Sequence, residues 1–125
     1  MTSSLLLVLR QFERRIEQGL LPTLAELELT IEHWRVLSVL LADPGQPMST
    51  LAEAAALPAA SLTRHVDKLV ERGLVVRRIH PDDRRRIVTA LSPVGIAVAE
   101  RVRTEERQIE AVLLGDLLPD GNTRT

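Results

Sequence analysis

Apolar residues recur every three or four positions in five segments of the chain, a spacing that places them along one face of an α-helix. The first segment has apolar positions at Leu5, Val8 or Leu9, Phe12, Ile16 and Leu20. This helix is expected to end near Gly19 to Pro22. Its apolar stripe has to be covered, either by the core of the same chain or by a second copy, and the pattern leaves both possibilities open.

Two further helices are expected after this one. Thr30 is a suitable N-cap for the second helix, which Asp43-Pro44-Gly45 would end. Its apolar positions are Ile31, Trp34, Leu37, Val39, Leu40 and Leu41, and Trp34 is interpreted as a core anchor rather than a platform for a ligand. Ser49 or Thr50 would start a short third helix, because Thr50-Leu-Ala-Glu53 has the spacing of a capping box. The core-facing positions of the third helix would be Leu51, Ala52, Ala55 and Leu57.

A fourth helix is predicted from Pro58 to Gly73. Proline is tolerated in the first turn of a helix, and glycine can end a helix in the left-handed conformation. The buried stripe would consist of Leu62, Val66, Leu69 and Val70. The opposite side carries polar and basic residues, namely Ser61, Thr63, Arg64, His65 and Lys68.

The next two segments, Leu74 to Ile79 and Ile87 to Leu91, are short and rich in β-branched residues, which predicts a β-hairpin. The loop between them ends in three consecutive arginines, Arg84, Arg85 and Arg86. The fold class that follows is mainly α with a small antiparallel β-hairpin. A helix that leads directly into a basic hairpin is the arrangement of a winged helix-turn-helix, here over residues of about 30–91.

Ser92-Pro93 has the residue types of an N-cap and a first helical position, and it would open a long fifth helix that ends near Gly115. The apolar positions of this helix are Val94, Val98, Val102, Ile109, Val112 and Leu113. Residues 119–125 show no periodicity and are expected to form a flexible tail.

The composition is that of one soluble domain. A chain of 125 residues can bury its own core, which must be built from aliphatic side chains because only 2% of the residues are aromatic. The absence of cysteine excludes thiol redox sensing and thiolate metal sites within this chain. The apolar run Leu5 to Leu9 is too short for a signal peptide or a membrane span, so a cytoplasmic protein without a membrane partner is expected.

Charge is unevenly distributed along the chain, although the net charge is only −1. Residues 1–60 carry four basic and seven acidic side chains, and residues 87–125 carry four basic and six acidic ones. Residues 61–86 carry eight basic and four acidic side chains, a net charge of +4. Because electrostatic fields act over about a Debye length, roughly 10 Å, this local excess can serve a nucleic-acid binder despite the net charge.

The basic residues of the fourth helix and the hairpin suit contact with double-stranded DNA. Ser61 and Thr63, near the helix N-terminus, suit phosphate contacts, and the longer side chains of Arg64, His65 and Lys68 can reach base edges. Arg64 is the strongest candidate for base readout, because a guanidinium can grip a guanine edge with two hydrogen bonds. The alternative interpretation, a solvated helix face, is weakened by the adjoining hairpin.

The three hairpin arginines repel one another unless an anion lies opposite. Asp82 and Asp83 offset part of this charge, a phosphate backbone would offset more, and an arginine at a hairpin tip can enter a narrow minor groove. A hydrated loop with an internal Asp–Arg pair is the alternative.

The chain resembles the multiple-antibiotic-resistance regulator (MarR) family of bacterial and archaeal transcription factors over roughly residues 5–115. The resemblance is carried by Ile31-Glu-His-Trp-Arg-Val-Leu37, by residues 57–75, and above all by Asp82-Asp-Arg-Arg-Arg-Ile-Val-Thr-Ala-Leu-Ser-Pro-Val-Gly95. This last segment is similar to the Asp-x-Arg wing of the family. On that match Asp83 would orient the wing, and Arg85 would be the arginine of the minor groove.

The resemblance also implies a homodimer, a pseudopalindromic operator, and a repressor relieved by a small effector bound between the DNA-binding and dimerisation regions. Family members usually continue into a sixth helix, whereas this sequence ends shortly after Leu118. Dimerisation would then rest on residues of about 1–22 and 93–118, or the sequence is a truncated form.

Two other classes of function fit the sequence less well. An enzyme is disfavoured because His33, His65 and His80 lie in different predicted elements and no residues show the spacing of a nucleophile or metal site, so no cofactor and no metal are expected. A winged-helix module used only for protein contact is the main alternative. Such a module would have little reason to keep the arginine cluster together with Arg64 and Lys68.

Overall fold

The computed structural model describes residues 4–117, which form five helices and one two-stranded antiparallel sheet. Their order is α1 (Leu5–Glu26), α2 (Ile31–Ala42), α3 (Met48–Ala55), α4 (Ala59–Glu71), β1 (Val75–His80), β2 (Asp83–Leu91) and α5 (Pro93–Leu117). The predicted fold class is confirmed. None of the helices in this range combines the length and the apolarity that crossing a bilayer requires. The flexible tail expected over 119–125 lies outside the described residues.

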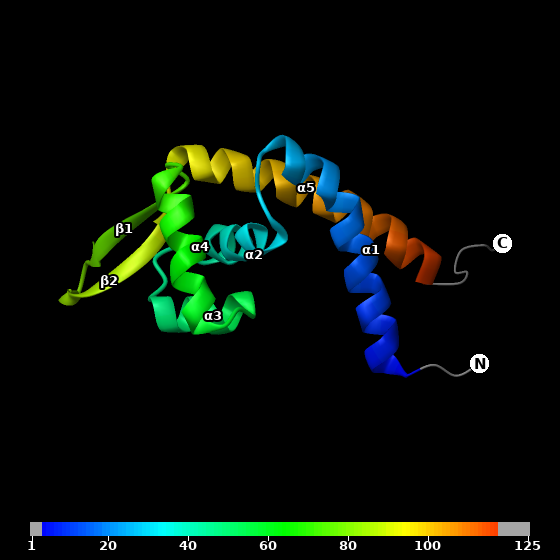
Figure 1. The fold of residues 1–125 in the computed structure, drawn as a ribbon, viewed down its shortest axis with the longest axis horizontal. Helices are drawn as coiled ribbons and strands as arrows, with labels where there is room; N and C mark the ends of the chain where they lie inside the picture. The colour runs from blue at the N-terminus through cyan, green and yellow to red at the C-terminus, as the bar shows by residue number, and fades with distance from the viewer. Residues whose placement is uncertain (1–3, 118–125) are drawn as a thin grey trace.

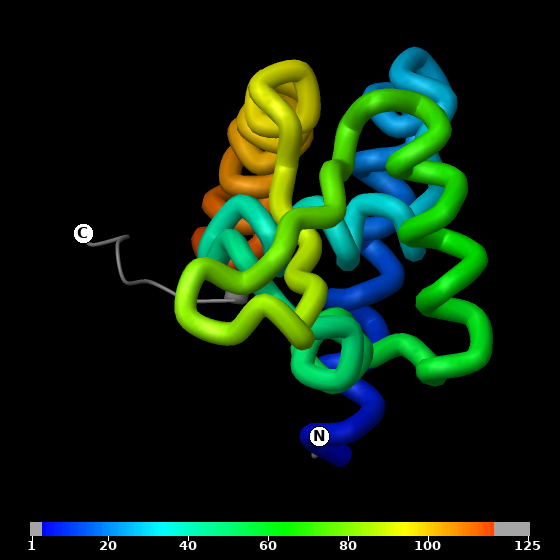
Figure 2. The backbone as a smooth tube through the Cα atoms, turned by 90° about the vertical axis from the view of Figure 1, so that its left-hand side faces the viewer, coloured from blue at the N-terminus to red at the C-terminus, as the bar shows by residue number. Residues whose placement is uncertain are grey.

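The elements form two connected regions (Figure 1). Helices α2, α3 and α4 gather beside the hairpin, while α1 and the second half of α5 lie together at the other end of the molecule. Helix α5 starts beside the hairpin, runs along the molecule, and contacts both α2 and α1. The tube in Figure 2 shows α4 and the start of α5 standing on either side of the hairpin strands.

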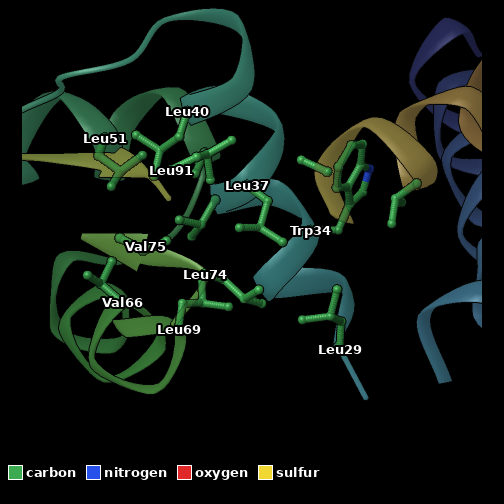
Figure 3. Packing of buried hydrophobic residues seen from close by; sticks show 14 of the residues in the cluster. Leu29, Trp34, Leu37, Leu40, Leu51, Val66, Leu69, Leu74, Val75 and Leu91 are labelled. Carbon is green, nitrogen blue, oxygen red and sulfur yellow. The ribbon is translucent and has the colours of Figure 1, made fainter. Parts of the chain in front are cut away.

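The core of the first region is aliphatic, as the composition predicts. Figure 3 shows side chains of α2, α3, α4 and both strands meeting in one cluster. Leu37, Leu51, Val66 and Leu69 are fully buried in it. Trp34 is also buried and belongs to the same cluster, on the side that faces α5. The prediction that Trp34 anchors the core is confirmed.

Helix α1 is longer than its sequence indicates. It continues past Gly19 and Pro22 to Glu26, so the expected end near Gly19 to Pro22 is wrong. Leu20 and Leu24, one turn apart, are both buried in the core. Gly19 lies so close to α5 that an added Cβ would be 2.7 Å from the Cδ1 atom of Ile109. Tertiary packing therefore compensates for the backbone hydrogen bond that Pro22 cannot donate.

The expected capping box of the third helix is also wrong. Helix α3 begins at Met48 with Pro47 as its N-cap, and no side chain caps it. The Thr50 hydroxyl instead donates to the Pro47 carbonyl oxygen at 3.0 Å, because Thr50 already lies within the first turn. Helix α4 likewise begins one residue later than expected, with Pro58 as its N-cap. Gly73 follows this helix with a φ of 76°, the left-handed conformation expected of a glycine that ends a helix.

The hairpin differs from the expected loop. Strand β2 begins at Asp83 rather than Ile87, so the three arginines belong to the strand, and only Pro81 and Asp82 form the turn. The segment before α3 adds to the sheet through an isolated bridge between Gln46 and Thr89. The backbone of Thr89 donates to and accepts from this segment, and its hydroxyl donates to the Gln46 carbonyl oxygen at 3.0 Å. This bridge supplies hydrogen bonds to a polar residue that is fully buried.

The start of α5 is fixed by side-chain and backbone contacts. As expected of an N-cap, the Ser92 hydroxyl accepts a hydrogen bond from the Gly95 N–H at 2.9 Å. The same hydroxyl donates to the Gly73 carbonyl oxygen at 2.6 Å. The helix continues two residues beyond its expected end at Gly115. Of its predicted apolar positions Val102 and Leu113 are buried, whereas Val94 and Val112 are exposed.

The N-terminus of α2 carries a capping box that the sequence did not predict. Thr30 Oγ1 accepts from the His33 N–H, and His33 Nδ1 accepts from the Thr30 N–H, both at 3.1 Å. The His33 ring meets the ring of His65 edge to face, with centroids 5.5 Å apart. Burial lowers the pKa of His33, and the neighbouring His65 and Arg72 lower it further. A neutral His33 therefore fits both its packing and its role as a hydrogen-bond acceptor.

Replacement of Gly95 by alanine is expected to destabilise the protein. An added Cβ would lie 1.9 Å from the Leu74 carbonyl oxygen, a clash that backbone atoms cannot relieve cheaply. We expect a net loss of about 2 kcal/mol or more in urea unfolding, despite the better helix propensity of alanine. Gly115→Ala is the matched control, because open space surrounds Gly115. It should be neutral or stabilise by up to about 1 kcal/mol, and equal effects of the two changes would contradict the described contact.

The stability of the fold should fall on mild acidification. Because the folded state lowers the pKa of His33, the unfolded chain takes up a proton first. The stabilising contribution is complete above the unfolded pKa of about 6.5 and is lost as the pH falls through that value toward the folded pKa. Thermal unfolding at pH values on both sides of this window measures the loss. His33→Gln keeps an acceptor for the capping box without a titrating ring. Acidification over the same pH range should therefore lower the stability of this variant less than that of the natural chain.

Candidate nucleic-acid interface

Helix α4 presents one exposed face away from the core. Thr63, Arg64 and Lys68 lie on this face, with Arg64 and Lys68 one turn apart, while Leu62 and Val66 point into the core. The Lys68 ammonium lies 3.6 Å from a carboxylate oxygen of Glu71, and both side chains are more than half exposed. The structure thus brings three of the five predicted helix residues together on one solvent-facing surface.

The other two predicted residues of this helix are placed differently. Ser61 is half-buried, and its hydroxyl donates to the Pro58 carbonyl oxygen at 3.1 Å. His65 is half-buried against the ring of His33 in α2. Both residues are therefore engaged by the protein itself in the described structure.

The wing, defined here as β1, β2 and the turn between them, contains an irregularity at its arginines. Ile79 pairs with Ile87, but the next residue of β1, His80, pairs with Asp83. Arg84, Arg85 and Arg86 thus have no partner residues in β1 and form a bulge in β2. The predicted loop position of the arginines is wrong for this reason: pairing continues past the bulge to the turn. All three side chains are exposed.

Asp83 organises this bulge through hydrogen bonding. Its Oδ1 atom accepts the Arg85 N–H at 3.0 Å and lies 3.6 Å from Arg85 Nε. The side chain of Arg85 nevertheless remains 92% exposed. The predicted alternative of an internal Asp–Arg pair therefore exists, but this pair leaves the guanidinium open to a further anion.

An ion pair that the sequence pattern did not predict connects the wing to α4. Arg77 of β1 donates to Asp67, which lies on the exposed side of α4. The only signal in the sequence was an acidic residue placed among the basic residues of the helix. Within residues 4–117, Arg64, Arg78, Arg84 and Arg86 form no ion pair. These arginines thus lie on the helix face and the wing, and the Arg77–Asp67 pair connects these two elements.

Arg72 belongs to the same basic segment but has a structural contact. Its guanidinium donates to the carbonyl oxygens of Leu27, at 2.7 Å, and Glu28. These carbonyl groups end α1, where Glu28 adopts a left-handed φ of 57°. Arg72 therefore joins the end of α4 to the link between α1 and α2, and its guanidinium is engaged by these carbonyl groups.

A cleft of about 470 Å³ lies on another part of the molecule, lined by α1, α2, the end of α3 and Glu106 of α5. Trp34 is in its wall, and the indole N–H donates to Glu106 Oε2 at 3.0 Å. Arg35 lies 3.4 Å from Glu13 and 3.5 Å from Glu17. Across residues 4–117, no three side chains of His, Asp or Glu come close enough together to hold a metal ion.

Comparison with known proteins points to one family. The sequence profile of the MarR family matches residues 27–86. Over 115 residues the chain is 30% identical to the homoprotocatechuate degradative operon repressor of Escherichia coli, and the match covers 89% of this chain and 78% of that protein. It is 34% identical over 95 residues to a transcriptional regulatory protein for the hcr operon of Thauera aromatica, a match that covers 74% of this chain but only about half, 52%, of that protein.

The fold is also shared with solved structures. NadR, crystallised in complex with 4-hydroxyphenylacetate, superposes with a TM-score of 0.79 at 26% identity, over 94% of this chain and 91% of that chain. The matched segment 27–86 contains α4, the turn of the wing and the arginine bulge. The resemblance suggested by the wing residues is confirmed, and the chain belongs to the MarR family of transcriptional regulators.

Proposed function

We propose that the chain is a homodimeric repressor that binds a pseudopalindromic DNA duplex and is released by a small effector. Helix α4 would enter the major groove, and the wing would reach an adjacent minor groove. The observation that carries this proposal is the arginine bulge, which Asp83 orients and which the Arg77–Asp67 ion pair joins to the exposed face of α4. Three like charges held together in this way favour an anionic partner.

The residues have distinct roles in this proposal. Arg64 reads base edges from α4, and Lys68 and Thr63 contact phosphates. The Ser61 hydroxyl would have to leave its hydrogen bond to the Pro58 carbonyl oxygen before it could donate to a phosphate. Arg85 enters the minor groove, and Arg84 and Arg86 contact the phosphates that border it. We assign His65 a positioning role, because its ring packs against His33 rather than extending outward.

The dimer contact is proposed at the start of α1 and the end of α5. Leu5 and Leu6 are 71% and 72% exposed, and Val112 and Leu114 are 64% and 54% exposed. Both helices also line one apolar groove, formed by Leu5, Val8, Leu9, Phe12, Ile16, Glu110, Leu113 and Leu114. Exposed leucines in such a cluster favour contact with another apolar surface. A second copy of the chain would cover them and provide two α4 helices for two half-sites.

The effector site is proposed at the cleft that contains Trp34. Its volume of about 470 Å³ is within the range of small-molecule sites, roughly 300–1,000 Å³. The solved relative NadR holds 4-hydroxyphenylacetate, which supports a small organic effector for this chain as well.

Arg85→Ala should weaken DNA binding by about 1 to 3 kcal/mol if Arg85 occupies the minor groove. Arg64→Ala should weaken DNA binding by a similar free energy. It should also relax the sequence preference, because it removes a contact to base edges. The probe is a duplex that the natural protein selects from a random library, titrated in gel shifts across a salt series. Arg107→Ala, an exposed arginine on α5, is the control. Unchanged DNA affinity in both Arg85→Ala and Arg64→Ala would contradict the proposed interface.

Leu114→Glu should convert the dimer to a monomer at micromolar concentration, because it places a charge in the apolar groove between α1 and α5. Sedimentation equilibrium measures the mass. Ile87→Glu is the control, since Ile87 is 58% exposed but lies on the wing. A natural chain that sediments as a monomer would contradict the proposed dimer.

A further inference from the structure

The cleft at Trp34 combines apolar walls with an excess of negative charge. Phe12, Ile16, Leu20, Ile31 and Val39 contribute apolar side chains around the indole. The charged side chains of its lining are three carboxylates, Glu13, Glu17 and Glu106, against one guanidinium, Arg35. Such a site fits a ligand with an apolar body and selects the sign of its charged group.

Arg35 is not free to receive an anionic ligand. Its guanidinium lies 3.4 Å from Glu13 and 3.5 Å from Glu17, which are one turn apart on α1. An incoming carboxylate would have to separate this trio and would then face both glutamates at close range. Within the cleft the trio carries one net negative charge, which disfavours an anion and favours a cation there. Arg10 and Arg14 lie outside the cleft lining, on an adjoining hollow that the trio also lines.

Glu106 supplies the second excess negative charge. Its Oε2 atom accepts the indole N–H of Trp34 at 3.0 Å, and the carboxylate is half-buried. Within residues 4–117 its other oxygen, Oε1, makes no hydrogen bond. This oxygen is an acceptor held at a fixed place beside an aromatic ring, and a protonated amine can donate to it.

We propose that the effector of this chain is an organic cation, an amine or ammonium group on an apolar or aromatic body, bound in the cleft at Trp34. The inference rests on the proposed function, since it names the chemical class of the proposed effector. The amine would donate to Glu106 at the inner wall, the apolar body would pack among the aliphatic side chains, and the acidic trio at Arg35 would add electrostatic attraction.

Three probes that share one ring test the sign of the charge. They are 4-hydroxyphenethylamine, which is cationic, 4-hydroxyphenylacetamide, which is neutral, and 4-hydroxyphenylacetate, which is anionic. Titration of the full chain is followed by calorimetry and by the fluorescence of Trp34, the only tryptophan in the sequence. The amine should bind at least about tenfold more tightly than the acid, with the amide between them.

A charge-neutral variant tests the assigned residue. Glu106→Gln retains an oxygen that accepts the indole N–H but removes the charge, so the affinity for the amine should fall several-fold more than that for the amide. Glu105→Gln, its neighbour on α5 outside the cleft lining, makes the same change in net charge and should leave all three affinities unchanged. If the Glu106 variant does not fold, the three probes on the natural chain decide the question alone.

Equal affinities, a preference for the acid, or the absence of binding by all three probes at millimolar concentration would overturn the cationic effector. DNA binding by the unliganded protein is measured in parallel by gel shift. Its failure would contradict the proposed repressor function, whereas intact DNA binding together with a failed amine titration would contradict only the effector class.

Discussion

The relative position of α4 and the wing depends on one backbone junction. There α4 ends, the two strands of the wing meet at their base, and α5 starts. Ser92 connects all of them: its hydroxyl donates to the Gly73 carbonyl oxygen and accepts from the Gly95 N–H, and its backbone N–H donates to the Leu74 carbonyl oxygen at 3.0 Å. Gly95 lacks a Cβ, which allows α5 to approach the Leu74 carbonyl group. Because these hydrogen bonds are buried or partly buried and converge on one residue, they hold the wing, α4 and the first turn of α5 in one arrangement.

Electrostatics then decides what this arrangement can contact. The chain as a whole carries a net charge of −1, yet the exposed side of α4 and the wing is positive. Two carboxylates shape that surface instead of cancelling it. Asp67 holds Arg77 and thereby the base of the wing, and Asp83 folds the bulge that presents Arg85. Local arrangement of charge, rather than net charge, is the quantity relevant to a duplex.

Helix α5 contacts both of the proposed sites. Its first turn belongs to the junction with the wing, and Glu106, three turns further on, lines the cleft at Trp34. Helix α2 makes a second connection, since Trp34 lines the cleft while the adjacent His33 packs against His65 of α4. A ligand that moves α2 or α5 would therefore act on elements that contact α4 or the wing directly. This is the physical basis on which effector binding and DNA binding can be linked in the proposed function.

The sequence alone determined the order and type of the elements, because helical periodicity, the left-handed Gly73 and the Ser92-Pro93 cap are local properties. It also indicated the basic helix and wing. Only the tertiary structure decided the length of α1, where packing of Gly19 against Ile109 outweighs Pro22, and the bulge at Arg84 to Arg86, which depends on the register between two strands. The Arg77–Asp67 pair and the acidic cleft at Trp34 likewise join residues distant in sequence. Periodicity shows which face of a helix is buried, but not which residue lies opposite.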